Sequence, residues 1–484
     1  MLGDKMPTQR TRRDFLKFSA AGLAASAATE ALGARPSRNA GNSAGEITVR
    51  VTDERRRFEV APASAWRPSS GRKLSGTIIT LNSEKKFQEI LGFGAAFTDA
   101  SCYLFSQLSE DSRQQLFHEL FHPSELGLSV CRTCIGASDY STEVYSFDEG
   151  EPDPDLKRFS IDHDRRYLLP ALRQARKVNP ELFLFSSPWS PPGWMKAANG
   201  SMLGGSMRKK YFASYAQYFL KFLQAYAAEG VAIQAVTPQN EVDTDQDGRM
   251  PACLWGQEYE IEFVKKHLGP VLRAGNIPTK IWLLDHNYNL WGRVICELDD
   301  RGLREYANAV AWHGYAGGAD MMSRVHDAHP EAAMYWTEGG PDFTSPDYAT
   351  DWAKWGRTFT EALRNWCRSI TGWNLALDEH GRPNIGPFSC GGLVTIHSQT
   401  KEITRSGQYW AFAHFSRLIR RGAHRFDSQG MGADVDHVAC ETPDGQRVMV
   451  ITNPATERRV VLRMGALVAE LTLPSNSVTT LAWR

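Results

Sequence analysis

Two glutamates in this chain of 484 residues each follow a short apolar run that is typical of a buried strand. Glu241 comes soon after residues 231–236, and Glu338 comes soon after residues 332–336. A strand that ends in this way places the carboxylate at its carboxyl end, where barrel enzymes carry their catalytic groups. Two carboxyls that face one cavity can act as nucleophile and general acid/base, which is the chemistry of glycoside hydrolysis. For either glutamate alone, an ordinary capping or surface role is the alternative.

The elements around the two glutamates indicate a parallel (β/α)8 barrel. The glutamates are 97 residues apart (338 minus 241), a gap that three βα units of the usual size fill, so we expect them on strands 4 and 7. Apolar, β-rich runs alternate with helical periodicity through this region. The eight expected strands are residues 90–97, 128–135, 182–186, 231–236, 280–284, 309–312, 332–336 and 370–375. The clearest expected helices are residues 210–228, 259–274, 348–367 and 408–420.

Strand patterns also occupy both ends of the chain, outside the barrel. Residues 47–51 and 77–81 near the N-terminus, and residues 447–452 and 478–483 near the C-terminus, show β texture without helical spacing. We therefore predict an α/β fold, a (β/α)8 TIM barrel with an attached β-sandwich formed by both chain ends. The expected parts are 1–34 (signal peptide), 35–46 (linker), 47–84 (first sandwich strands), 85–423 (barrel) and 424–484 (remaining sandwich).

The charge balance excludes one class of partner. The chain has 55 Lys and Arg against 55 Asp and Glu, so it has no basic field to attract phosphate backbones or anionic lipid. Nucleic acid is therefore not an expected partner. The 14 Trp and 15 Tyr provide flat aromatic faces, which stack on sugar rings as well as filling cores.

The N-terminus has the layout of a twin-arginine export signal. Arg12 and Arg13 lie in Thr-Arg-Arg-Asp-Phe-Leu-Lys, ahead of a weakly apolar, Ala-rich run over residues 18–31. Ser19 and Glu30 are among the polar residues that make this run unsuitable as a membrane anchor. We expect cleavage between residues 28 and 34, a periplasmic or extracellular protein and no stable membrane insertion; a basic disordered tail is the alternative.

Several motifs fall at the ends of the expected strands. They are GFGAAFTDA (92–100), SPWSPP (187–192), Asn240-Glu241, WHGY (312–315), Glu338 and GWNLAL (372–377). In this order they resemble the lysosomal glucosylceramidase group of glycoside hydrolase family 30, from about residue 87 to the C-terminus. The resemblance implies a retaining β-glycosidase with a (β/α)8 barrel and an attached β-sandwich, in agreement with the layout above.

The resemblance also implies roles for residues around the pair. Glu241 matches the general acid/base and Glu338 the nucleophile, and ionised Glu338 is expected to raise the proton affinity of Glu241. Asn240 matches the residue that bonds the sugar 2-hydroxyl, although it is equally natural as a turn-former before a helix. Arg132 and Tyr315 match groups that hold the nucleophile ionised and oriented, and an Arg in an apolar strand needs a buried anion.

Other matches concern the pocket for the sugar. Asp99 is expected to accept hydrogen bonds from sugar hydroxyls, and Trp189 and Trp373 to supply stacking surface. Asn374 and Tyr315 are expected in the same substrate-binding pocket. His313 could belong either to the pocket or to the packing beneath it.

Loops at the mouth of the site are expected to shape the subsite for the aglycone, beyond the scissile bond. Two long connections, residues 137–161 and 188–209, are expected to wall it. Val242 stands where the family usually has proline, and an acidic loop follows it, which makes a lipid-like aglycone less certain. The acidic residues are Asp243, Asp245 and Asp247. Three residues after the fifth strand are expected on the aglycone side: His286, Tyr288 and Trp291.

The expected function is retaining, exo-acting hydrolysis of β-glucosides by double displacement through a covalent glycosyl-enzyme, on a carbohydrate or glycolipid substrate. An endo-β-1,6-glucanase, or a β-xylosidase or β-fucosidase of the same family, is the alternative, and a non-catalytic carbohydrate-binding barrel is a remote one. No cofactor or metal is expected, because no His-x-His or similar spacing supports a metal hydrolase. A metal hydrolase on this fold would draw its ligands from Asp285, His286, His313 and Glu338. The sequence leaves the sugar and the oligomeric state open.

Overall fold

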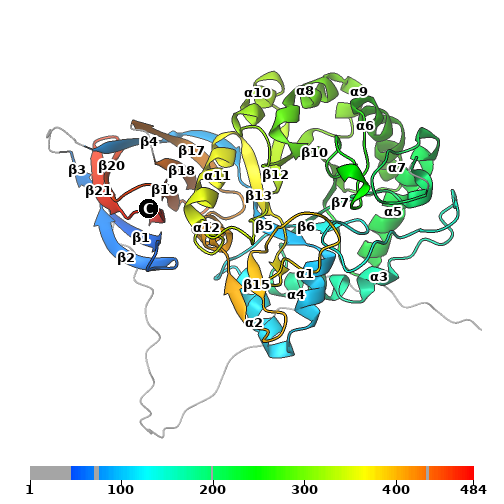
Figure 1. Ribbon diagram of the computed structural model, residues 1–484. Helices are drawn as coiled ribbons and strands as arrows, with labels where there is room; N and C mark the ends of the chain where they lie inside the picture. The colour runs from blue at the N-terminus through cyan, green and yellow to red at the C-terminus, as the bar shows by residue number, and fades with distance from the viewer. Residues whose placement is uncertain (1–44, 70–75, 198–199, 432–434) are drawn as a thin grey trace, which may run out of the picture. The chain divides into compact units, whose positions relative to one another are not determined.

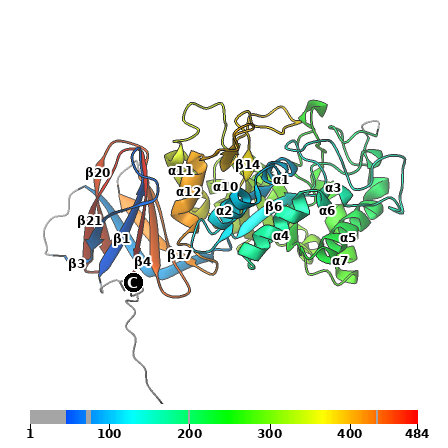
Figure 2. The ribbon, with the colours of Figure 1, turned by 90° about the horizontal axis from the view of Figure 1, so that it is seen from below.

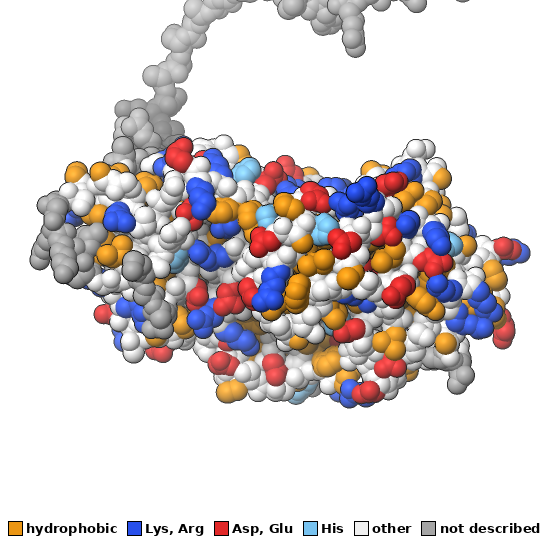
Figure 3. Space-filling model, turned by 90° about the horizontal axis from the view of Figure 1, so that it is seen from above, with side chains coloured by type: hydrophobic (Ala, Val, Ile, Leu, Met, Phe, Trp, Pro, Cys, Tyr) orange, Lys and Arg blue, Asp and Glu red, His pale blue; other side chains and the backbone are white. Residues whose placement is uncertain are grey.

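The computed structural model describes residues 45–69, 76–197, 200–431 and 435–484 (Figure 1). The expected signal peptide and most of the expected linker lie outside the described residues, so twin-arginine export stays a prediction. None of the helices in the described part of the chain combines the length and apolarity that a bilayer crossing requires. Figure 3 shows acidic and basic side chains interspersed over one face, in keeping with the balanced charge.

The predicted parallel barrel is confirmed. Nine strands pair side by side in the order β10-β11-β12-β13-β5-β6-β7-β8-β9, and every pair is parallel. Their bounds are β5 Gly92–Phe97, β6 Val130–Cys134, β7 Phe183–Ser187, β8 Ala235–Val236, β9 Lys280–Ile281, β10 Leu283–Asn287, β11 Ala309–His313, β12 Ala333–Glu338 and β13 Cys367–Gly372. The expected fifth strand is divided at Trp282: β9 pairs with β8 and β10 pairs with β11. This one strand in two pieces closes the barrel.

Helices follow the barrel strands (Figure 1). They are α1 Asp99–Ser106, α2 Glu110–Phe121, α3 Asp162–Arg165, α4 Leu168–Val178, α5 Phe212–Ala228, α6 Gln257–Phe263, α7 Gly269–Ala274, α8 Trp291–Asp299, α9 Arg301–Arg304, α10 Asp320–Ala328, α11 Trp352–Arg364 and α12 Gly407–Ser416. Short 3-10 turns span Gly193–Met195, Lys209–Tyr211, Gln246–Gly248 and Tyr288–Leu290.

The helix expected over residues 259–274 is interrupted. A π-helical turn, Val264–Leu268, separates α6 from α7. Pro270 follows this turn and has no N–H for the regular i→i−4 hydrogen bond, so the chain winds more widely before it. Gly269 also packs against the ring of Tyr306, where a Cβ atom would come within 2.3 Å of a ring carbon.

The sandwich contains strands from both ends of the chain, as predicted. Its hydrogen-bonded order is β2-β1-β22-β19-β18-β17-β4-β20-β21-β3. The bounds are β1 Glu46–Thr52, β2 Glu59–Ala65, β3 Arg67–Pro68, β4 Thr77–Glu89, β17 His424–Met431, β18 Asp436–Glu441, β19 Arg447–Asn453, β20 Arg458–Met464, β21 Leu467–Leu473 and β22 Ser477–Trp483. The boundary expected after residue 84 falls inside β4, which runs on to the start of the barrel. A small third sheet holds β14 Ala376–Leu377, β15 Val394–Ile396 and β16 Ile403–Arg405.

Helices α11 and α12 lie between the sandwich and the barrel strands (Figure 2). His414 on α12 is fully buried at this junction, and its ring nitrogens lie 2.8 Å from the hydroxyls of Thr480 on β22 and Thr52 on β1. Burial, together with the charges of Arg417 and Arg50, lowers the pKa of His414 to about 3. The neutral ring therefore joins the two parts of the fold.

We predict that the free energy of unfolding of the His414→Gln variant falls less steeply with decreasing pH than that of the wild type. An unfolded histidine has a pKa of about 6.5, so between that value and about 3 the unfolded chain binds a proton that the folded chain excludes. Stability contributed by this site is intact above pH 6.5 and falls as the pH falls, by about 2 kcal/mol at pH 5. Denaturant unfolding of both proteins at pH 7.5 and 5 measures the difference, and identical pH slopes would contradict it.

Candidate active site

The two predicted catalytic glutamates share one cavity at the carboxyl ends of the strands. Glu338 is the last residue of β12, and Glu241 follows β8 with a positive φ of 55°. The cavity has a volume of about 420 Å³. It is lined by Asp139, Trp189, Glu241, Thr244, Gln246, Met250, His286, Asn287, Tyr315, Glu338, Trp373, Phe388 and Cys390. The two long connections expected to wall the site contribute Asp139 and Trp189.

Arg132 binds Glu338 and two further polar side chains, Asn240 and Asp285. It lies on β6 without exposed surface, and its Nη1 donates to Oε2 of Glu338 at 2.5 Å. Its Nη2 donates to Oδ1 of Asn240 and to Oδ2 of Asp285, both at 2.7 Å. The structure therefore brings Arg132 and Asn240 to the nucleophile candidate. Tyr315 completes the contact, because its hydroxyl donates to the other oxygen of Glu338 at 3.1 Å.

Asp285, on β10, is a central residue that sequence reasoning considered only as a possible metal ligand. It is fully buried, and both its oxygens accept hydrogen bonds. The donors are Arg132 (2.7 Å), Ser187 (2.6 Å), Thr237 (2.7 Å), Thr337 (2.8 Å) and His313 (3.0 Å). Burial raises its pKa, but Arg132 and the other donors outweigh this and hold the pKa well below its usual range. With its acceptor capacity filled, this carboxylate orients its neighbours and is not available as a metal ligand. An Asp at the end of an apolar run, next to a His, was the only sequence signal.

His313 stands between the two candidate catalytic carboxyls. Its Nδ1 lies 3.4 Å from Oε1 of Glu241, and its Nε2 lies 3.8 Å from Oε2 of Glu338 and 3.0 Å from Oδ1 of Asp285. Burial lowers its pKa, but the surrounding carboxylates raise it to about 9. The ring does not line the cavity. It lies under the site, as a cation in contact with both glutamates.

Glu241 and Glu338 titrate as a pair. Burial raises the pKa of Glu338; His313 and Arg132 lower it, and nearby carboxylates raise it again, to a value above the ordinary one. Burial also raises the pKa of Glu241, but its contacts with His313 and His286 outweigh this and lower it. These contacts favour the charge on Glu241 over the charge on Glu338. This order is opposite to the expected one, because His313 approaches Glu241 more closely than Glu338.

Two aromatic rings form one wall of the cavity. Trp189 and Trp373 stack with ring centroids 4.9 Å apart and an interplanar angle of 19°. The guanidinium of Arg132 lies 4.6 Å from the centroid of Trp189, so the cation also supports this wall. Both tryptophans line the cavity, and their stacking on a sugar ring stays a prediction.

Asp99 and Asn374 are not brought to the cavity. The carboxylate of Asp99 accepts hydrogen bonds from Thr142, Tyr167 and His163 and is 1% exposed. Asn374 is fully buried and accepts a hydrogen bond from Thr98 at 2.9 Å. Their expected contacts with substrate stay predictions that this geometry does not support.

Asp139 occupies the position that we expected for Asp99. It lines the cavity, is 4% exposed, and its Oδ1 has no hydrogen-bond partner among the described residues. Burial, with the charges of Glu338 and Glu241, raises its pKa well above the usual range. A buried carboxyl with a free oxygen facing a polar cavity is suited to bonding a sugar hydroxyl. Sequence reasoning missed it because it lies in a loop of unassigned structure.

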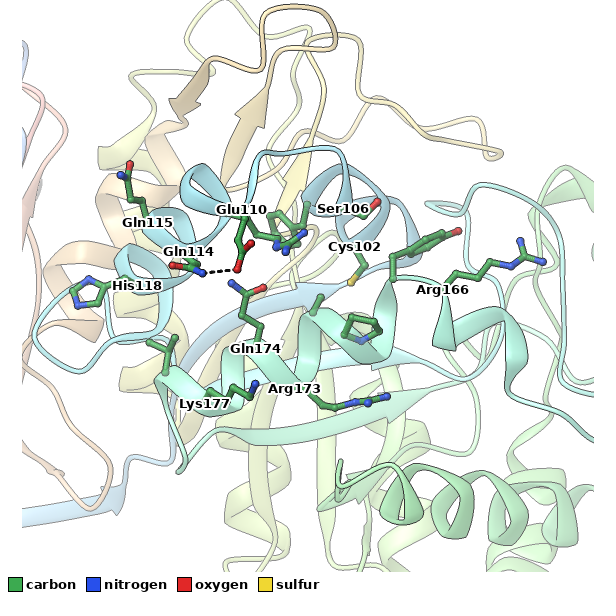
Figure 4. Close-up of a pocket in the computed structure, with 16 residues that line it drawn as sticks. Cys102, Ser106, Glu110, Gln114, Gln115, His118, Arg166, Arg173, Gln174 and Lys177 are labelled. Carbon is green, nitrogen blue, oxygen red and sulfur yellow. Dashed lines mark hydrogen bonds between the residues drawn. The ribbon is translucent and has the colours of Figure 1, made fainter.

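A larger cavity of about 1070 Å³ lies on the outside of the barrel, between α2 and α4 (Figure 4). Gln174 and Lys177 on α4 face Glu110 and Gln114 on α2, whose side chains bond each other at 3.0 Å. Its lining contains a single carboxylate, that of Glu110, and therefore not the pair that glycoside hydrolysis requires. The chemistry is concentrated in the smaller cavity.

Comparison with known proteins identifies the same two-part arrangement. The glycosyl hydrolase family 30 TIM-barrel domain matches residues 90–419, and the glycosyl hydrolase family 30 beta sandwich domain matches residues 422–481. An endo-1,6-beta-D-glucanase of Neurospora crassa is 33% identical over 405 residues, covering 80% of this chain and 83% of that protein. The lysosomal acid glucosylceramidase of Mus musculus is 28% identical over 456 residues, covering 89% and 87%. A solved endo-beta1,6-glucanase has a TM-score of 0.81 at 28% identity, covering 91% of this chain and 99% of that one.

Replacing the two aspartates separately tests which one contacts substrate. We predict that Asp139→Ala lowers kcat/KM on an aryl β-glucoside by about 10- to 100-fold, because it removes a hydrogen bond to the sugar. Asp99→Ala should instead lower the free energy of unfolding by about 1–3 kcal/mol, because it leaves buried donors without a partner. Steady-state kinetics and denaturant unfolding of both variants measure this. A larger kinetic loss in the Asp99 variant than in the Asp139 variant would reverse the assignment.

Proposed function

Because the chain belongs to glycosyl hydrolase family 30 and is a glycoside hydrolase, we propose that it cleaves β-glucosidic bonds with retention of configuration. One observation carries the proposal: Glu241 and Glu338 contact the same imidazole, that of His313, at 3.4 and 3.8 Å, and both line one cavity. These contacts bring both carboxyls to one ring, and we assign them as a retaining pair, the kind in which the carboxyls are about 5–5.5 Å apart without room for an intervening water.

In the first step, Glu338 is the nucleophile. Its carboxylate attacks the anomeric carbon while Glu241 gives a proton to the departing glycosidic oxygen, so one C–O bond forms as the other breaks. Arg132 and Tyr315 hold one oxygen each of Glu338 and so fix the angle of attack. Asn240 is kept beside the nucleophile by Arg132, where its amide can bond the 2-hydroxyl.

In the second step, Glu241 is the base. It takes a proton from water, whose oxygen attacks the anomeric carbon and releases Glu338 as a carboxylate. Gln246 donates to Oε2 of Glu241 at 3.0 Å and fixes its orientation for both proton transfers. The stereochemistry inverts twice, and the product sugar keeps the β configuration.

Substrate binding has to move the shared proton onto Glu241. A sugar that fills the cavity displaces the water around Glu241, and this desolvation raises its pKa. Positive charge that develops on the anomeric carbon favours the ionised form of Glu338 at the same time. In the complex with substrate, Glu338 is therefore the ionised member of the pair and Glu241 the protonated one.

The rim of the cavity favours a hydrophilic aglycone. The side chain of Asp243 is 43% exposed and that of Asp247 is 84% exposed, and both lie in the loop after Glu241. An acidic, solvated loop is a poor contact for a ceramide tail and a good one for sugar hydroxyls. Together with similarity to endo-1,6-glucanases of Neurospora crassa and Trichoderma harzianum, this makes β-1,6-glucan the first candidate substrate.

Exo-cleavage of small β-glucosides is the second candidate, as expected from the sequence. The stacked pair Trp189 and Trp373, together with Asp139, encloses a cavity of about 420 Å³, a size suited to a terminal sugar.

Variants of the two carboxyls test the mechanism. We predict that Glu338→Gln lowers kcat by about four orders of magnitude or more, because no covalent intermediate can form. Glu241→Ala should keep the nucleophile, so azide should rescue it on an activated aryl β-glucoside and give the β-configured glycosyl azide. NMR of the product fixes the configuration. An α-configured azide, or near-wild-type turnover by the Glu338 variant, would refute the proposed roles.

A substrate panel with products separated by size tests the specificity. We expect the wild-type enzyme to release glucose or short oligosaccharides from β-1,6-glucan faster than it hydrolyses glucosylceramide, because the rim is acidic. Short oligosaccharides appearing first indicate endo cleavage, and glucose alone indicates exo cleavage. The Glu338→Gln variant is the background control. Preference for glucosylceramide or for aryl β-xylosides over glucosides would contradict the assignment.

A further inference from the structure

Two histidines direct their free ring nitrogens at the same oxygen. Nδ1 of His313 lies 3.4 Å and Nδ1 of His286 lies 3.8 Å from Oε1 of Glu241. The three atoms lie within 4.8 Å of one another. His286 is 5% exposed and His313 is fully buried, yet neither Nδ1 has a hydrogen-bond partner among the described residues. Buried ring nitrogens without partners are uncommon, so these two call for a ligand.

The opposite nitrogen of each ring is held by a carboxylate. Nε2 of His286 lies 2.5 Å from Oδ1 of Asp243, and Nε2 of His313 lies 3.0 Å from Oδ1 of Asp285. A carboxylate on one nitrogen fixes a proton there, so the other nitrogen is the one that offers a lone pair when the ring is neutral. This carboxylate–histidine pairing is the arrangement that supports histidine ligands of metal ions. Here it occurs on both rings, and the two Nδ1 atoms face one oxygen, Oε1 of Glu241.

We propose that Glu241, His286 and His313 form a binding site for Zn²⁺, and that the ion inhibits hydrolysis when it binds there. Two imidazole nitrogens and one carboxylate oxygen are a common ligand set for zinc, which binds each at about 2.0–2.2 Å. Ligand atoms around such an ion lie about 3.3 Å apart in tetrahedral geometry. The observed 3.4 and 3.8 Å are near this value, and the two nitrogens, which lie within 4.8 Å of each other, have to approach. Two of the ligand residues, Glu241 and His286, line the cavity.

Inhibition follows from the identity of the carboxylate. Zinc bound to Oε1 of Glu241 withholds the lone pair with which this residue exchanges protons, and so stops both steps. This part rests on the proposed role of Glu241, whereas binding of the ion does not. Zinc must also displace the proton on Nδ1 of His313, which is a cation with its pKa raised to about 9, so zinc affinity should rise with pH and binding is measured at both pH 8 and pH 9.

Calorimetric titration of Zn²⁺ into the full-length, EDTA-treated protein tests the site. One ion should bind per chain. His286→Ala should weaken binding by about 100-fold or more, since it removes a ligand, and Asp243→Asn by about 10- to 100-fold, since it removes the support of that ligand. The Asp243 side chain is half exposed, so this variant is expected to fold. His380→Ala, at a surface histidine 3.7 Å from Glu379, is the matched control and should bind as wild type.

Two further readouts separate the parts of the proposal. Co²⁺ in place of zinc should give the visible absorption of a tetrahedral ion in wild type and lose it in His286→Ala. Zinc should inhibit hydrolysis of an aryl β-glucoside over the range in which it binds, EDTA should restore activity, and residual activity of His286→Ala should resist zinc. Equal zinc affinity of wild type and His286→Ala would overturn the site. Full activity with zinc bound would overturn the inhibition. Neither result would alter azide rescue of Glu241→Ala, which tests the hydrolytic role by itself.

Discussion

The buried guanidinium of Arg132 is the interaction on which the rest of this site depends. It has no exposed surface, and it bonds Glu338, Asp285 and Asn240 at once. Removing one partner of a buried ion pair costs about 3–5 kcal/mol, so the barrel is stable only if its strands bring these carboxylates together. The requirement that keeps the core folded is therefore the same requirement that assembles the chemistry.

The charges around Arg132 explain why Glu241 and Glu338 share one proton. Arg132 and His313 are cations, and Asp285 is an anion held by five donors. If one of Glu241 and Glu338 is ionised and the other protonated, the buried cluster is neutral. Two charged glutamates would leave a net negative charge out of contact with water, which is costly. A pair with a single proton is also the state in which one member can attack while the other donates.

The sequence predicted the strands of the barrel better than it predicted which residues line the cavity. Apolar runs of strand length predicted all eight barrel strands, and Glu241 and Glu338 were found because they end such runs. The division of one strand at Trp282 depends on how the barrel closes, which local pattern does not record. Asp99 and Asp139 both follow strand ends, and only the path of the connecting loop decides which one meets the cavity. The orienting role of Asp285 was not predicted, because it depends on five partners far apart in the chain.

The sandwich joins the first strands to be synthesised with the last. β1 pairs with β2 and with β22, and β4 lies between β17 and β20, so β1 lacks one neighbour and β4 lacks both until the C-terminal strands have been made. Until then the early strands present open edges, which are prone to pair with other chains. A chain that stops after the barrel keeps every catalytic residue but leaves these edges uncovered. Complete synthesis of the chain is therefore the condition for covering these strand edges.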